Sequence, residues 1–227
     1  MGDIRVHIEV GARRTFATAL DWPGWCRSGK DEATALATLL AYAPRYAVVA
    51  RDTGQELPEP LNLTVVETQP GTATTDFGVP GNLAGGDGEP MSPAESARIL
   101  RLVEASWRYF DSIAATAPEH LRKGPRGGGR DRDAIIDHVI ASEAGAYAPK
   151  LGLQMQHAVR GDTARIAAAR MAVIDRLRAG APPPMGNRTY WPPRHAARRI
   201  AWHVLDHAWE MEDRSVTSAG GAGIDGS

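Results

Sequence analysis

The sequence predicts an α+β protein in which a small ββαβ module precedes an antiparallel four-helix bundle. Residues 4–10 alternate between apolar and polar side chains, which is typical of a half-buried strand. Residues 71–91 are rich in Gly, Thr and Pro and lack a helical period, whereas four segments beyond them repeat apolar residues at helical spacing. We therefore expect a module at 1–70, a linker at 71–91, a bundle at 92–215 and a disordered tail at 216–227.

The elements of the first module follow from short patterns along the chain. Strands are predicted at 4–10, 15–20 and 61–66, with a helix at 30–50 between the last two. Pro44 lies inside the helical pattern, where it interrupts or kinks the helix. His7 falls on the polar face of the first strand, so we expect it to be solvated.

The bundle helices carry clear boundary signals. Ser92, Pro93 and Glu95 form a capping box at the start of the first helix. Asp162 is a good N-cap for the third. The four helices are predicted at 92–117, 131–147, 162–178 and 191–214.

Composition and charge exclude several classes of partner. The 26 basic and 27 acidic side chains nearly cancel, so no net field favours nucleic acid or a membrane surface. The N-terminus lacks the apolar core of a signal peptide, and no run approaches the roughly 18 apolar residues of a spanning helix. Cys26 is the single cysteine, so no intramolecular disulfide can form. We expect a cytoplasmic protein without a membrane or nucleic-acid partner.

Three histidines are candidate metal ligands. His203 and His207 are four residues apart on the apolar stripe of the last helix, so both imidazoles can aim at one point. His138 lies on the apolar stripe of the helix at 131–147, and facing helices of a bundle commonly hold a metal between them. Three neutral imidazoles leave a coordination position open, as in catalytic zinc sites. The alternative is that these histidines are satisfied residues of an ordinary core.

The side chains around the histidines are less informative. Glu143, Asp206 and Glu210 are candidates to accept a hydrogen bond from the second nitrogen of a ligating imidazole. Asp206 and Glu210 could equally form surface ion pairs with nearby arginines. Cys26 is expected to be a small buried residue rather than a reactive thiol, because nothing in the sequence indicates a lowered pKa. No catalytic side chain is identified.

Two segments resemble known families. IIDHVIASEAGAYAPKLG together with RHAARRIAWHVLDHAWEMEDR resembles the DinB-like superfamily of metal-binding four-helix bundles, over about residues 92–214. That family has one His on the second helix and HxxxH on the fourth, and His138, His203 and His207 match these positions. The resemblance implies a divalent ion, zinc or nickel. Characterised members include S-transferases and isomerases that use a low-molecular-weight thiol.

The first third of the chain carries the other resemblance. FATALDWPGWCRSGKDEATALATLLAYAPRY resembles the HicB-like domain, which serves protein contacts and sometimes RNA-related roles. Arg13, Arg14 and Lys30 are scattered and form no basic cluster, so nucleic-acid binding is the minority interpretation.

These observations lead to one principal functional hypothesis and two alternatives. The first is a metal-dependent transferase that brings a small thiol and an electrophile together. The second is a non-enzymatic regulatory or binding protein with a structural metal, whose HicB-like part engages a partner. The third is a metal-dependent hydrolase, with water as the nucleophile. The oligomeric state is left open between a monomer and a homodimer.

Overall fold

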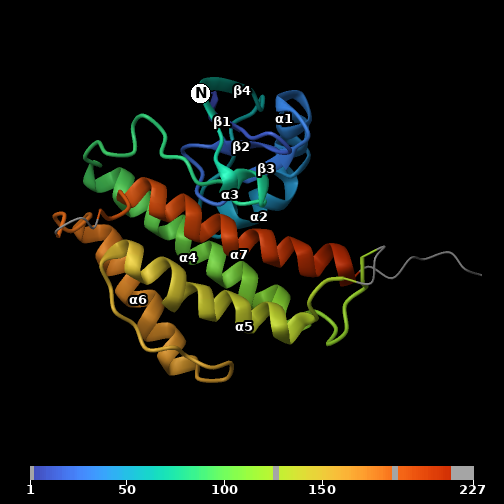
Figure 1. Cartoon of the computed structure of the whole chain (residues 1–227), viewed down its shortest axis with the longest axis vertical. Helices are drawn as coiled ribbons and strands as arrows, with labels where there is room; N and C mark the ends of the chain where they lie inside the picture. The colour runs from blue at the N-terminus through green and yellow to red at the C-terminus, as the bar shows by residue number, and fades with distance from the viewer. Residues whose placement is uncertain (1–2, 125–127, 186–188, 216–227) are drawn as a thin grey trace, which may run out of the picture.

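The computed structural model describes residues 3–124, 128–185 and 189–215, so the predicted tail at 216–227 lies outside the described residues. The fold is mixed α/β, with a four-stranded sheet in the N-terminal part followed by helices. Figure 1 shows the sheet module above the helices α4 (Pro93–Thr116) and α7 (Pro193–Ser215). The helices α5 (Arg132–Ser142) and α6 (Thr163–Ala179) lie on the opposite side of this pair (Figure 1).

The sheet contains one strand that the sequence did not predict. The strands β1 (Ile4–Val10), β2 (Thr15–Ala19), β3 (Cys26–Gly29) and β4 (Leu63–Pro70) have the spatial order β3-β2-β1-β4. β1 pairs antiparallel with β2, β2 pairs antiparallel with β3, and β4 lies parallel to β1. β3 has the sequence CRSG, which lacks apolar alternation, so its pairing with β2 rather than its composition makes it a strand.

The predicted helix at 30–50 is two helices. α1 (Glu32–Ala41) ends at Tyr42, and α2 (Ala43–Arg51) begins directly after it with Pro44 in its first turn. The chain bends by 48° there, because proline has no N–H to continue the preceding helix. Within the described residues, no single helix is both long and apolar enough to cross a membrane. In the part of the chain that the structure describes, the bent pair α1 and α2 meets the length and composition requirements together.

Two of the three polar side chains of β1, His7 and Glu9, are buried, contrary to the expectation that His7 is solvated. His7 is 3% exposed and Glu9 is 2% exposed, because the segment after β4 covers this face of the sheet. The Glu9 carboxylate accepts hydrogen bonds from the Thr75 hydroxyl and from the backbone N–H groups of Gly81 and Asn82. Alternation therefore identified the strand, but it did not show that a later segment of the chain covers His7 and Glu9.

The segment predicted as a linker contacts both parts of the protein. It contains the short helix α3 (Ala73–Asp76), whose Thr75 is fully buried against Glu9. Further along, Asp87 is 2% exposed and accepts two hydrogen bonds from Arg198 of α7, at 2.5 and 2.6 Å. Phe77 is 87% exposed, so the segment also presents one large apolar side chain to solvent.

The four long helices share one core, but they are not all antiparallel. Arg194 at the start of α7 binds Glu95 at the start of α4, and the backbone N–H of Arg122, beyond the end of α4, donates to Arg214 at the end of α7. α4 and α7 are therefore parallel neighbours. After α5 the chain crosses back along the bundle before α6 begins, so that α5 and α6 run in the same direction (Figure 1). Bundles with a long crossover connection have this kind of topology.

The sheet module and the bundle bury side chains together. Leu102 and Ala105 of α4, with Leu205 and Trp209 of α7, belong to the same buried cluster as the core residues of the sheet and of α1 and α2. Trp209 is 1% exposed, and its ring lies 5.1 Å from that of Tyr42. α7 is consequently covered by the sheet module on one side and by α5 and α6 on the other.

Candidate metal centre

α5 and α7 bring the three predicted histidines together. His203 and His207 lie one turn apart on α7, and His138 faces them from α5. One nitrogen atom from each of the three imidazoles lies within 4.8 Å of the others. The Nε2 atoms of His138 and His203 are 3.2 Å apart. The bundle core thus places three nitrogen donors around one point.

This arrangement fits a divalent ion. Zinc–nitrogen bonds of about 2.0–2.1 Å at a tetrahedral centre put the ligand nitrogens roughly 3.3 Å apart, close to the separation of His138 and His203. Burial and the neighbouring histidines lower the pKa of His203 well below its usual value, and burial lowers the pKa of His138. Both imidazoles are therefore neutral at pH 7, which is the state that binds metals.

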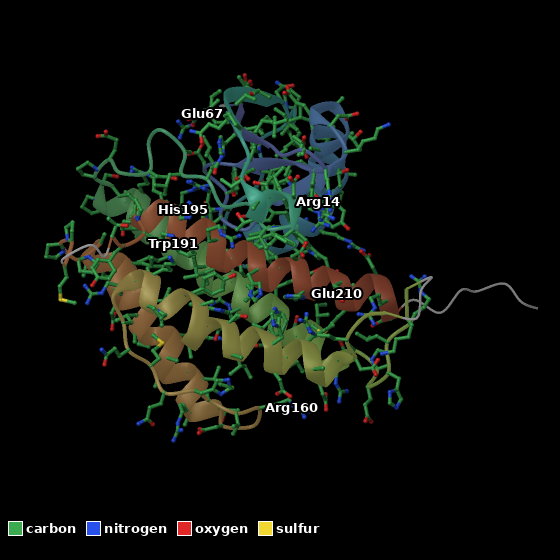
Figure 2. The ribbon with its side chains drawn as sticks, viewed as in Figure 1. Arg14, Glu67, Arg160, Trp191, His195 and Glu210 are labelled. Atoms are coloured by element: carbon green, nitrogen blue, oxygen red, sulfur yellow. The ribbon has the colours of Figure 1, made fainter. Side chains whose placement is uncertain are left out.

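One acidic side chain orients a histidine. Oε2 of Glu210 lies 2.9 Å from Nδ1 of His207, which leaves Nε2 of that ring for a metal. Arg214 holds the carboxylate from the other side, with Nη1 2.6 Å from Oε1. Burial alone would raise the pKa of Glu210, but the hydrogen bonds from His207 and Arg214 lower it, so the group is a carboxylate at neutral pH. Figure 2 shows Glu210 toward the far end of α7 from His195.

The other two acidic candidates have different partners. Asp206 accepts a hydrogen bond from Arg27 of β3 at 2.8 Å, so it joins α7 to the sheet. The Glu143 carboxylate accepts from the indole N–H of Trp107 at 2.8 Å, and Arg170 lies 3.4 Å away. A π-helical turn at Glu143–Tyr147 follows α5 and changes the side-chain directions that a continuous helix would give. Among the three candidates, only Glu210 contacts an imidazole.

The same π-helical turn brings in Tyr147, which the sequence did not single out. Its ring lies 5.3 Å from the ring of His203 and 5.9 Å from that of Trp191. Nδ1 of His203 is buried and has no hydrogen-bond partner in the described part of the chain. Tyr147 therefore lies against His203, and Trp191 lies against Tyr147.

His195 and Arg199 continue the histidine stripe toward the start of α7. Together with His203 and His207 they recur every four residues, a spacing that could have identified them from the sequence. His195 is 2% exposed. Burial, followed by the charge of Arg198, lowers its pKa to about 4. Figure 2 shows Trp191 and His195 near the start of α7.

Cys26 is buried and unreactive, as expected. Its sulfur accepts a hydrogen bond from the Thr18 hydroxyl at 3.0 Å, and burial raises the pKa of the thiol to about 12. A thiolate is the reactive form of cysteine, so this side chain supplies no nucleophile at neutral pH.

Comparisons of the chain with protein-family models, with curated proteins and with solved structures give no match in any of the three. A functional assignment therefore rests on the chemistry of the site.

Proposed function

We propose that the protein is a divalent-metal-dependent transferase that joins a low-molecular-weight thiol to an electrophilic carbon. One observation carries the proposal: three imidazoles converge, and no carboxylate or cysteine joins them in the described residues. A divalent ion held in this way keeps a position open, at which it stabilises a thiol as the nucleophilic thiolate. The resemblance of His138, His203 and His207 to the DinB-like motif points to the same activity.

The protein's own groups have separable roles in this proposal. His138, His203 and His207 hold the ion, and imidazole nitrogen suits both zinc and nickel. Glu210 fixes the tautomer and orientation of His207, and Arg214 fixes Glu210. No side-chain nucleophile is required, which agrees with the buried, protonated thiol of Cys26.

A cleft beside Glu210 offers room for a small second substrate. It has a volume of about 250 Å³ and lies between α7 and the strands β2 and β3. Phe16 and Trp202 line its apolar part, and Asp206 and Glu210 line its polar part. In this proposal the sheet module, which resembles a HicB-like domain, forms one wall of the substrate site.

Metal-dependent hydrolysis is the second candidate, because the same three ligands leave the same position free for water. Cobalt substitution separates the two activities. The cobalt-loaded protein is titrated with 2-mercaptoethanol while the near-ultraviolet absorption is recorded. Intense sulfur-to-metal absorption is expected in the wild type, and none in a variant with Ala at positions 138, 203 and 207. A wild-type spectrum that thiol leaves unchanged would contradict the transferase and leave hydrolysis as the better proposal.

A second measurement tests the alternative of a purely structural metal. Thermal unfolding is recorded with and without a chelator, because the binding energy of a structural metal is folding energy. We expect the metal-free protein to stay folded, since four packed helices and the sheet module hold α5 and α7 in place. Unfolding on chelation, without thiol absorption in the wild type, would favour the regulatory or binding protein.

A further inference from the structure

Five charged side chains of the described chain border the cleft beside Glu210. They are Asp206, Glu210 and Asp213 of α7, Arg27 of β3, and Arg14 of the turn that precedes β2. Figure 2 shows Arg14 in the sheet module and Glu210 below it on α7. A ligand that enters the cleft meets these charges, so their pairing determines which ligand charge the cleft accepts.

The three carboxylates of the cleft already have arginine partners. An opposite charge at hydrogen-bond distance compensates most of the field that a carboxylate would exert on a ligand. None of these carboxylates therefore needs a cation from outside the protein. The pairs are Asp206 with Arg27 at 2.8 Å, Glu210 with Arg214 at 2.6 Å, and Asp213 with Arg45 of α2.

Arg14 differs from the other four charged side chains. It forms no ion pair and no side-chain hydrogen bond within the residues that the structure describes. Its side chain is exposed, so a molecule in the cleft can reach the guanidinium group. Once the paired charges are set aside, the cleft carries one uncompensated positive charge, and a ligand with one negative charge complements it.

Gly78 places the guanidinium group of Arg14 at the cleft. This glycine follows α3, has a φ of 95° and also borders the cleft. A Cβ atom on it would lie 3.0 Å from Nη1 of Arg14, so the guanidinium group lies directly over the backbone of Gly78. Residues other than glycine rarely adopt this φ. The turn before β2 and the segment after α3 together hold the donors of Arg14 beside the cleft.

We propose that Arg14 binds a carboxylate of the electrophilic substrate, so that the cleft selects small molecules with one negative charge. The planar fork of a guanidinium group matches a carboxylate, and the cleft, at about 250 Å³, has room for one on a small molecule. A phosphate monoester carries about −1.5 to −2 at pH 7, which exceeds the single charge of Arg14. The inference rests on the proposed function for the word electrophilic, whereas the carboxylate site does not depend on a metal.

The test compares benzoate with benzamide, which has a similar shape and no charge. Isothermal titration calorimetry at low ionic strength measures both affinities on protein treated with a chelator. In the wild type we expect benzoate to bind about tenfold more tightly than benzamide, and in Arg14→Met we expect the two to bind equally. Arg13→Met is the matched control and should retain the preference, because this neighbouring arginine of the same turn is exposed and does not border the cleft.

Three results would overturn the carboxylate site. They are equal binding of the two probes by the wild type, an equal loss of preference in Arg13→Met and Arg14→Met, and no detectable binding of benzoate at millimolar concentrations.

The thiol absorption of the cobalt-loaded protein separates this inference from the proposed function. Arg14→Met should keep that absorption, because Arg14 holds the second substrate and not the thiol. Loss of the absorption in this variant would overturn the assignment of Arg14 to the second substrate. A benzoate preference without thiol absorption in the wild type would overturn the transferase and support the carboxylate site. Thiol absorption without a benzoate preference would support the transferase and overturn the carboxylate site.

Discussion

Nδ1 of His207 and Oε2 of Glu210 lie 2.9 Å apart, three residues from each other on α7. Asp206 stands next to His207 in the sequence, yet its carboxylate points to Arg27 of β3 instead. Glu210 and Asp206 therefore have distinct partners, one at the histidine cluster and one at the sheet. Substituting each of these two residues separately tests whether the contact between Glu210 and His207 matters for metal binding.

The first prediction concerns Glu210→Gln. Loss of the charged acceptor should weaken metal binding by about tenfold, because carboxylate partners of metal-binding histidines typically contribute 10–100-fold in affinity. Metal affinity is measured by competition with a chromophoric chelator. Asp206→Asn is the matched control, since it removes a similar charge from the same helix without touching an imidazole. An equal loss of affinity in both variants would show that only net charge matters.

The second prediction concerns metal content. The purified protein should contain or take up about one divalent ion per chain, and replacing His138, His203 and His207 together by Ala should abolish this. Elemental analysis after dialysis measures the ratio. His157→Ala is the control, because that imidazole is exposed outside the centre. Undiminished metal binding by the triple variant would rule out the assigned ligands.

The third prediction is a loss of stability in acid that depends on His195. Its pKa is about 4 in the folded protein, against about 6.5 in an unfolded chain. Above pH 6.5 both states are neutral. Below pH 6.5 His195 is protonated in the unfolded chain but stays neutral in the folded protein. The free energy of unfolding therefore falls between pH 6.5 and 4. The contribution of this one group should be about 2 kcal/mol between pH 7.5 and 5.

Urea unfolding at the two pH values measures this effect. A chelator is present throughout, so that protons do not compete with a metal. The His195→Gln variant should lose about 2 kcal/mol less than the wild type over the same interval, whatever its stability at pH 7.5. His157→Gln, at an exposed position, should behave like the wild type. An unchanged pH dependence in His195→Gln would mean that His195 titrates normally.

The sequence was most informative where one element decides the environment of a residue. The stripe of α7 predicted that His203 and His207 share a face, because spacing along one helix determines which side chains are neighbours. His138 was placed with them because bundle helices pack through their apolar stripes, and the two helices do meet there.

The sequence was least informative where two distant segments meet. The burial of His7 and Glu9 depends on a covering segment more than 60 residues later, whose Thr75 contacts Glu9. β3 exists because β2 offers it a partner, and its own four residues give no strand signal. The partner of Glu143 depends on a π-helical turn, in which backbone hydrogen bonds span five residues instead of four. The spacing of apolar residues in the sequence does not reveal such a turn.

The last prediction concerns how far the sheet module and the bundle are independent. Phe77, at 87% exposure, offers chymotrypsin an accessible cleavage site in the segment predicted as a linker. The sequence predicts that the first cut falls within residues 71–91 and separates two modules.

The shared core adds a further expectation, because Leu102, Leu205 and Trp209 of the bundle are buried with the sheet module. The two fragments of the nicked protein should therefore elute together from a sizing column without denaturant, and Trp209→Ala should make them separate. Removal of a buried Trp costs about 3–5 kcal/mol and leaves a cavity in this contact. Trp191→Ala is the control, since this indole packs against the bundle core. Fragments of the wild type that elute apart would show that the buried cluster does not hold the two parts together.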